Sequence, residues 1–422
     1  MVQWNVPLIA FLVVFGASSV FRLLLAYINV VHIRRHGYDV PEVFQGEIDE
    51  ATLARMTAYT AESSRFGAVA HFFDDAVTLL VLLSGFLPLL VGLLLSWNLH
   101  FILSGLIFFG ALALLSGILD IPFSLYSTFV IEKRYGFSTI TVRLWIADLI
   151  KGLLISTMLS GILLGAMLAL VYYAEHTWWL WAWLFFSAFQ MLIIWLYPIL
   201  IAPLFNKFEP IENEALKEAI ITLMAKVGLR TGGVFQVDAG KRSKHTNAYF
   251  TGLGETKRIV LYDTLLKSHT SEEILSVLAH EAGHWKKRHI MKQVILTETV
   301  AFVFLYLVYR LIDWPLLYQT FGFAENIPYV GLLLIAAIFG PIVFFLTPIG
   351  AMLTRRFERE ADDFCYILVG TTMPMINALK RLAKDNLANL HPHPFYAWFY
   401  YSHPPLTERI ARLLGMEDSK KS

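Results

Sequence analysis

Charged residues and cysteine are scarce in this chain. Only 16% of its 422 residues are charged, against roughly 25% in a soluble globular domain, while 57% are hydrophobic and the mean hydropathy is +0.58. A soluble fold of this size cannot bury that much apolar surface, and the composition also excludes a disordered chain, a coiled coil and collagen. The single cysteine, Cys365, excludes an intrachain disulfide and any multi-cysteine metal site. A net charge of +1 gives no reason to expect nucleic acid as a partner.

Long apolar runs are abundant, and each is close to the roughly 20 residues that a helix needs to cross a bilayer. All Lys and Arg residues except Arg22 and Arg310 fall between alternate runs, and the positive-inside rule makes that side cytoplasmic. We therefore expect an integral, multi-pass membrane protein, in the endoplasmic reticulum or a bacterial inner membrane. The predicted transmembrane helices are residues 6–31, 76–97, 101–121, 152–173, 178–201, 294–312 and 328–353.

The same runs divide the chain into four parts. Two hold membrane spans, residues 1–201 and 294–353, and two lie on the cytoplasmic side, residues 202–293 and 354–422. Within the first cytoplasmic part, an amphipathic helix is expected before three runs of β-forming residues. A three-stranded sheet is too small to stand alone and must pack on neighbouring helices, so we predict a mainly α protein with a small sheet. The helix is expected near residues 212–227 and the strands at 234–239, 248–251 and 258–262.

One short motif carries candidate chemistry. His280 and His284 are four residues apart in a helix expected from Ser271 to about His289, so both imidazoles lie on one face and can reach one metal ion. Glu281 is placed to take a proton from a water molecule activated by zinc. The alternative is that these are ordinary polar residues on a helix, so the motif needs a third ligand.

A charged cluster after the last apolar run offers that ligand. Glu358 and Glu360 are about 200° apart on a helix and cannot both face one metal. Asp362 shares the face of Glu358, one turn further on, and could hydrogen-bond a ligating histidine. We therefore choose Glu358 as the third ligand. A solvated charged run next to the membrane is the alternative.

Five motifs, in this order along the chain, resemble those of the type I CAAX prenyl endopeptidases, which are integral membrane zinc proteases of the gluzincin type. The resemblance extends from the first span to about residue 415. The motifs are Pro203-Leu-Phe-Asn-Lys-Phe208, Asn247-Ala-Tyr-Phe-Thr-Gly252, His280-Glu-Ala-Gly-His284, Phe357-Glu-x-x-Ala-Asp362, and Ser402-His-Pro-Pro405 with Glu408-Arg409.

The resemblance implies a function and a role for each motif. One zinc ion per chain is bound by His280, His284 and Glu358, and Glu281 is the general base. His403 helps to hold the oxyanion, and Arg409 is an ion-pair partner near the site. An edge strand pairs with the substrate backbone, seven helices surround a chamber, and a monomer removes the last three residues of a prenylated protein or peptide in the lipid bilayer. The residues of that edge strand are Asn247, Ala248, Tyr249 and Phe250.

Other functions are compatible with parts of the sequence. A membrane quality-control protease with broader substrates would use the same site residues. A seven-helix transporter or receptor with an incidental motif would bind no metal and would spread ligand-lining polar residues through many spans, often with repeats that this chain lacks. An intramembrane protease would hold the motif inside an apolar span, whereas Lys286, Lys287 and Arg288 follow it here.

Overall fold

The apolar runs form long helices that expose apolar side chains. In the computed structural model, which describes residues 2–251 and 256–419, six helices are long and apolar enough to cross a membrane, and only 0% to 28% of the most apolar stretch of each is buried. Such surfaces are stable among lipid chains and not in water. The six are α1 (Val6–His36), α2 (Glu50–Leu83), α4 (Phe101–Tyr126) with α5 (Glu132–Arg134), α6 (Val142–Tyr173), α7 (Trp178–Leu196) with α8 (Ala202–Phe205), and α12 (His289–Leu311).

A seventh candidate span is bent. Helices α14 (Pro328–Phe344) and α15 (Thr347–Val369) meet at an angle of 56°, and together they are long and apolar enough to cross. The prediction of a multi-pass helical membrane protein is therefore confirmed, with six or seven spans among the described residues. The chamber expected within the helices stays a prediction.

The second span differs from the prediction. Residues 76–97 were expected as one helix, but α2 ends at Leu83 and a separate short helix, α3 (Phe86–Ser96), follows. Gly85 adopts φ 84°, a left-handed conformation that ends the first helix and turns the chain. The span is α2 itself, whose polar first half does not stand out by hydropathy.

Four strands, rather than the predicted three, form the sheet. Their order is β1-β2-β4-β3, with β2 parallel to β4 and the two outer strands antiparallel to their neighbours. The strand missed was β1, which is three residues long and contains Pro210, a residue tolerated only at an edge. The strands are β1 (Phe208–Pro210), β2 (Arg230–Val237), β3 (Ala248–Thr251) and β4 (Thr256–Tyr262).

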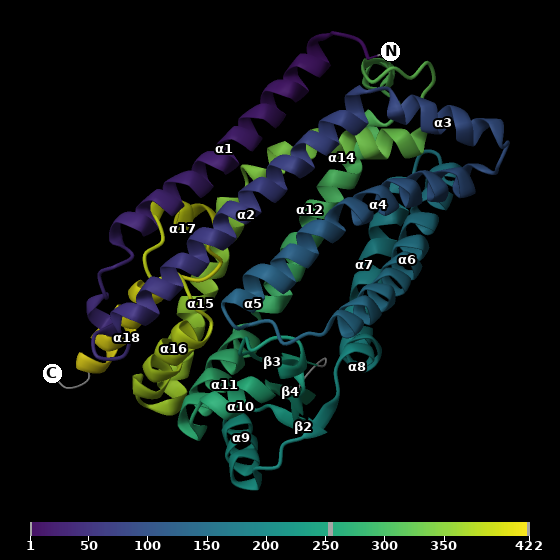
Figure 1. Ribbon diagram of the computed structural model, residues 1–422. Helices are drawn as coiled ribbons and strands as arrows, with labels where there is room; N and C mark the ends of the chain where they lie inside the picture. Colours follow the sequence, from purple (N-terminus) through teal and green to yellow (C-terminus); the bar gives the residue numbers. More distant parts are fainter. Residues whose placement is uncertain (1, 252–255, 420–422) are drawn as a thin grey trace.

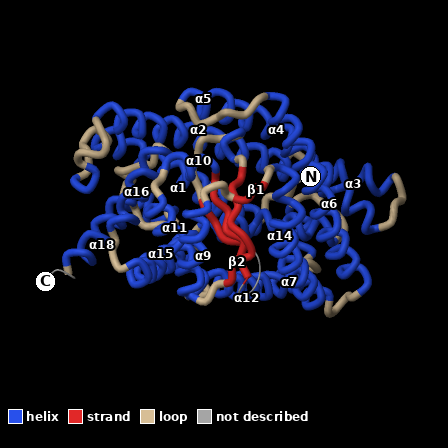
Figure 2. The backbone as a smooth tube through the Cα atoms, turned by 90° about the horizontal axis from the view of Figure 1, so that it is seen from below, coloured by secondary structure: helices blue, strands red, loops and turns tan. Residues whose placement is uncertain are grey.

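The sheet lies among helices at one end of the molecule. Figure 1 shows β2, β3 and β4 beside α9, α10 and α11 at the end opposite the N-terminus, and Figure 2 shows the strands in the middle with helices around them. One buried apolar cluster fills this end, and a second lies among the membrane helices. The remaining helices are α9 (Glu214–Val227), α10 (Asp263–Ser268), α11 (Ser271–Lys286), α13 (Pro315–Thr320), α16 (Met373–Asp385), α17 (Pro394–Tyr400) and α18 (Leu406–Asp418).

Candidate metal centre

Helix α11 carries the two histidines. It begins with a capping box, in which the Thr270 hydroxyl accepts from the backbone N–H of Glu273 and the Glu273 carboxylate accepts from the N–H of Thr270. The box fixes where the helix starts, and the apolar residues Ile274, Leu278 and Ala282 define the face that is buried. His280 is 5% exposed on that face, and His284, one turn later, is partly buried.

Helix α15 approaches α11 closely because a glycine separates the two histidines. A Cβ atom built on Gly283 would lie 3.0 Å from the Cα of Ala361 and 3.1 Å from its carbonyl oxygen. A side chain at this position would press on the backbone of α15, and glycine avoids that contact. The contact continues at Cys365, whose Sγ lies 3.3 Å from the carbonyl oxygen of Ser276. The single cysteine is thus a buried part of this interface.

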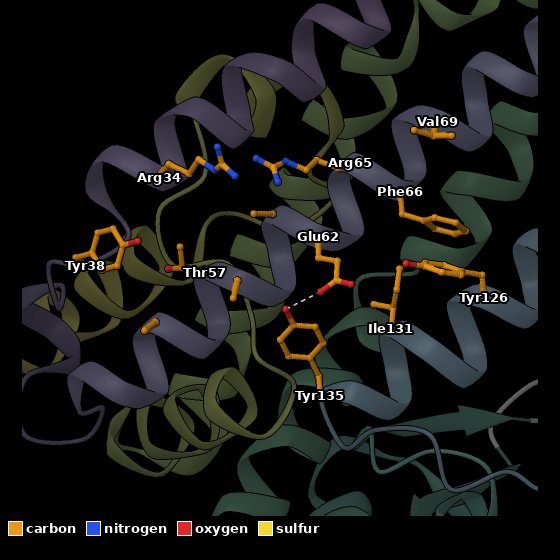
Figure 3. A pocket seen from close by; sticks show the side chains of 13 residues that line it. Arg34, Tyr38, Thr57, Glu62, Arg65, Phe66, Val69, Tyr126, Ile131 and Tyr135 are labelled. Carbon is orange, nitrogen blue, oxygen red and sulfur yellow. Dashed lines mark hydrogen bonds between the residues drawn. The ribbon is translucent and has the colours of Figure 1, made fainter.

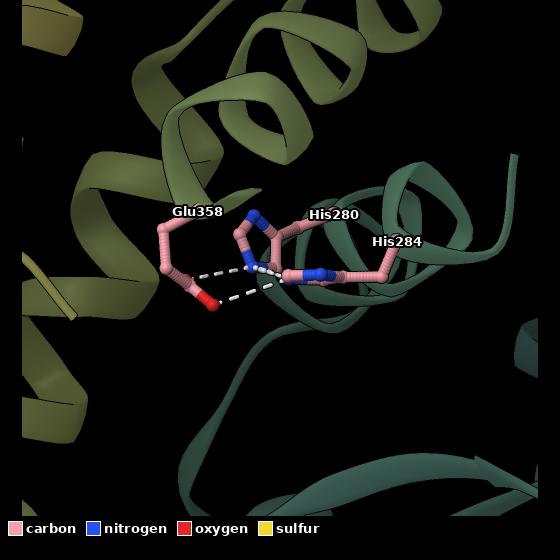
Figure 4. A group of neighbouring side chains, drawn as sticks. All are labelled: His280, His284 and Glu358. Atoms are coloured by element: carbon pink, nitrogen blue, oxygen red, sulfur yellow. Dashed lines mark hydrogen bonds and ion pairs between the residues drawn. The ribbon is translucent and has the colours of Figure 1, made fainter. Parts of the chain in front are cut away.

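The close approach brings Glu358 to the histidine pair, as Figure 4 shows. The His280 Nε2 lies 3.1 Å from the His284 Nε2, and each of these nitrogens lies 3.3 Å from one oxygen of Glu358. Within residues 2–251 and 256–419, this is the one group of three His, Cys, Asp or Glu side chains that could hold a metal ion, and its ligand atoms all lie within 4.8 Å of one another.

These distances suit a zinc ion. Nitrogen and oxygen ligands at about 2.0–2.2 Å from zinc, arranged tetrahedrally, lie about 3.3–3.6 Å from one another, close to the observed separations. The Glu358 Oε2 is also buried and accepts no hydrogen bond of good geometry, although His280 lies nearby. The nearest protein cation is the Arg409 Nη1, which lies 3.6 Å from this oxygen, too far for a hydrogen bond. The oxygen can therefore still accept a ligand. The three residues therefore fit a metal ion.

A buried ion pair fixes the first histidine. The His280 Nδ1 lies 2.8 Å from Asp362, and the Arg409 guanidinium donates two hydrogen bonds, of 2.8 and 2.6 Å, to the same carboxylate. Burial and Arg409 lower the pKa of His280, but the carboxylates of Asp362 and Glu358 outweigh them and raise it to about 9. Because a ligating imidazole must be free of that proton, a metal ion and a proton compete for this ring.

A second chain of hydrogen bonds, which the sequence analysis missed, reaches the other histidine. The His284 Nδ1 lies 3.0 Å from the His289 Nδ1, and the His289 Nε2 lies 3.1 Å from Glu360. His289 is 1% exposed and stacks on Phe357, with ring centroids 4.2 Å apart and planes 9° from parallel. The sequence signal was a third histidine five residues after the motif. Arg288, with φ 55°, turns the chain so that His289 faces back.

The remaining predicted residues surround this cluster unevenly. Glu281 is partly buried, and burial raises its pKa above the usual range for a glutamate. His403, on the loop before α18, has its Nε2 3.3 Å from the Glu358 Oε1, and its Nδ1 lies 2.9 Å from the Ser402 hydroxyl. Its side chain is 62% exposed, so it borders the cluster from the open side.

The predicted edge strand is at an edge. Ala248, Tyr249 and Phe250 lie in β3, which pairs only with β4 in the described sheet and packs beside α11. Asn247 precedes the strand, and its side-chain oxygen accepts from the N–H of Ala248. One long side of β3 is therefore free of strand partners.

Two histidines of an HExxH helix beside a glutamate from a second helix, in a helical membrane protein, are the arrangement expected of a membrane metallopeptidase. Comparison with known proteins identifies the family. Residues 29–207 match the family described as CAAX prenyl protease N-terminal, five membrane helices, and residues 210–417 match peptidase family M48, a family of zinc metallopeptidases. The chain belongs to the CAAX prenyl protease family of M48 peptidases.

Individual relatives agree over nearly the whole chain. The CAAX prenyl protease 1 homolog of Oryza sativa is 35% identical, covering 95% of this chain and 97% of the relative. The CAAX prenyl protease 1 of Saccharomyces cerevisiae is 33% identical, covering 91% and 90%. The crystal structure of S. mikatae Ste24p is 31% identical and superposes with a TM-score of 0.90 over 96% of this chain and 98% of that one. The predicted family and the predicted metalloprotease activity are confirmed.

Proposed function

We propose that this protein hydrolyses a peptide bond near the C-terminus of prenylated CAAX substrates, with one zinc ion per chain bound by His280, His284 and Glu358. The observation that carries the proposal is the buried cluster of these three side chains, in a chain whose relatives are named CAAX prenyl proteases along most of their length. Zinc would supply electrostatic stabilisation of the scissile carbonyl and a water molecule that is easier to deprotonate.

The surrounding residues perform the other tasks of the proposed reaction. Glu281 accepts a proton from the attacking water and passes it to the nitrogen of the leaving amine, so no covalent intermediate with the enzyme forms. Its raised pKa suits a group that must both take and release a proton near neutral pH. His403 donates a hydrogen bond to the oxyanion of the tetrahedral intermediate from its Nε2, the ring nitrogen that lies beside Glu358, while its Nδ1 contacts the Ser402 hydroxyl.

The substrate chain and the two histidine rings must be held in fixed positions for this reaction. The free side of β3, from Ala248 to Phe250 with Asn247 before it, holds the substrate chain extended by main-chain hydrogen bonds. Asp362 with Arg409 fixes the ring of His280, and His289 fixes the ring of His284.

We further propose that the protein acts as a monomer in a eukaryotic endoplasmic reticulum or a bacterial inner membrane. The basic residues support an orientation with residues 202–293 and 354–422 in the cytoplasm. These two parts would then meet substrates that carry a lipid-modified C-terminus at the membrane surface.

One experiment tests both the chemistry and the substrate. The protein is purified in detergent, its zinc content per chain is measured, and cleavage of a farnesylated CAAX peptide is followed beside the same peptide without the prenyl group. Glu281→Gln serves as the control, which should keep its zinc and lose turnover. Zinc near one per chain with cleavage of the farnesylated peptide alone supports a prenyl protease.

Broader proteolysis is the second candidate, because the same site would serve a membrane quality-control protease. Equal cleavage of both peptides would favour it and would contradict a requirement for the prenyl group. Loss of zinc from the Glu281→Gln variant would contradict the assignment of that residue as a base.

A further inference from the structure

A groove of about 720 Å³ lies apart from the metal centre, along the outer face of α2. The residues that α2 contributes, among them Ala58, Arg65 and Val69, follow one another at helical spacing on a single face. Leu53 and Met56, each 1% exposed, lie on the opposite side of the helix, in the buried apolar cluster around the sheet and α11. The groove therefore opens away from the catalytic core, and the end of α1 and the junction of α4 with α5 form its other walls.

Two arginines on different helices point toward each other across this groove. Figure 3 shows the guanidinium of Arg34, from the last turn of α1, directed at that of Arg65 on α2. Within residues 2–251 and 256–419, neither has a hydrogen bond or ion pair to a protein group. Two like charges held across one groove repel each other, and an anion between them removes that cost.

The one carboxylate in the groove does not neutralise these arginines. Glu62 accepts a hydrogen bond of 2.9 Å from the Tyr135 hydroxyl and is paired with Arg134. Its charge is thus compensated within the protein, which leaves the positive charge of the arginine pair available to a ligand.

The other half of the groove is apolar. Phe66 stacks on Tyr126, with ring centroids 5.0 Å apart and planes 26° from parallel, and Val69 beyond them is 61% exposed. The apolar surface continues past the groove at Phe72, also 61% exposed. A ligand that fills the groove therefore has an anionic group at one end and an apolar chain at the other.

The groove also lies at the boundary between the apolar, membrane-spanning part of the helices and their polar ends, where lipid headgroups are found. The apolar run of α1 is followed directly by Arg34, Arg35 and His36 in its last turn, and on α2 the polar half gives way to the apolar half after Arg65. Basic pockets between transmembrane helices at this depth bind the headgroups of anionic lipids.

From these contacts we infer that the groove binds an anionic phospholipid. Its phosphate lies between Arg34 and Arg65, and one acyl chain lies along Phe66, Tyr126 and Val69 onto the outer face of α2. The site is independent of the proposed proteolysis, because it shares no residue with the metal cluster.

The test measures lipid binding to the full chain in nanodiscs. Native mass spectrometry counts the phospholipids retained in nanodiscs of phosphatidylglycerol mixed with phosphatidylcholine. The double variant Arg34→Gln/Arg65→Gln is compared with Arg35→Gln/Arg143→Gln, which removes the same charge from exposed arginines that do not line the groove. We expect the first variant to lose phosphatidylglycerol affinity about tenfold to thirtyfold, and the second to lose much less.

Two further measurements distinguish the possible outcomes. Glycerol 1-phosphate is added as a competitor that offers the phosphate without the acyl chains, and thermal unfolding checks that both double variants are folded. Equal losses in the two variants, or retention of phosphatidylglycerol by the Arg34→Gln/Arg65→Gln variant, would overturn the site. Displacement of the lipid by glycerol 1-phosphate at equal concentration would show an anion site that does not use the acyl chain, and would also overturn it.

Discussion

Replacing His289 by phenylalanine tests whether hydrogen bonds outside the ligand set control metal affinity. Phenylalanine keeps the stacking on Phe357 but leaves the Nδ1 of His284 without its partner at 3.0 Å. Losing such a partner of a metal ligand costs about 10–100-fold in metal affinity, or about 1.4–2.7 kcal/mol at 25 °C.

An independent estimate gives the same range. A buried donor left without an acceptor costs about 1–3 kcal/mol, and because the His284 side chain is 20% exposed, water replaces part of the lost bond. We therefore expect the weakening of zinc binding to lie nearer to tenfold than to 100-fold.

The assay is a competition titration of zinc against a chelator of known affinity, with thermal unfolding measured on the same samples. His391→Phe is the matched control, because that ring bonds the backbone oxygen of Asp39 far along the chain from the motif. A His289→Phe variant that is folded and binds zinc as tightly as the unmodified protein would refute the reasoning. Weaker zinc binding in both variants would show a general effect of losing a histidine.

Two more substitutions test the packing around the metal centre. Gly283→Ala should destabilise the protein by about 1–3 kcal/mol and weaken zinc binding, since its Cβ would push α15 and Glu358 away. Its control is Gly415→Ala, where no atom lies within 4 Å of the added Cβ. This control should be neutral or stabilising in thermal unfolding. Arg409→Leu should cost about 3 kcal/mol, because it removes the guanidinium that bonds twice to the buried Asp362 carboxylate and leaves it only His280 as a partner. The corresponding change at the more exposed Arg412 should cost about 1 kcal/mol or less in denaturant unfolding.

The parts of the site that the sequence predicted are those that local geometry decides. Two histidines four residues apart share a face in any helix, and the angular separation of Glu358 from Glu360 follows from 3.6 residues per turn. The structure places Glu358 beside the histidines, and Glu360 instead on His289. These relations hold within single helices, so no knowledge of the tertiary fold was needed.

The parts that the sequence did not predict depend on contacts between elements. His289 meets His284 only because the backbone reverses at Arg288 in a left-handed conformation, which is uncommon for a residue with a side chain. Strand β1 owes its existence to pairing with β2 rather than to its own three residues. The first half of α2 is too polar to be recognised as part of a membrane span by hydropathy. It is helical because Leu53 and Met56 pack in the buried cluster at the end of the molecule that holds the sheet.

The distribution of the proposed zinc ligands over two helices has a consequence for biosynthesis. His280 and His284 lie on α11, but Glu358 is translated only after the whole of α12 and α14, and Arg409 later still, in α18. A nascent chain that already displays its HExxH helix therefore has an incomplete ligand set while its last apolar helices enter the membrane. With this ligand set, the unfinished protein has no complete zinc site, so it is inactive until the later helices have been translated and have assembled.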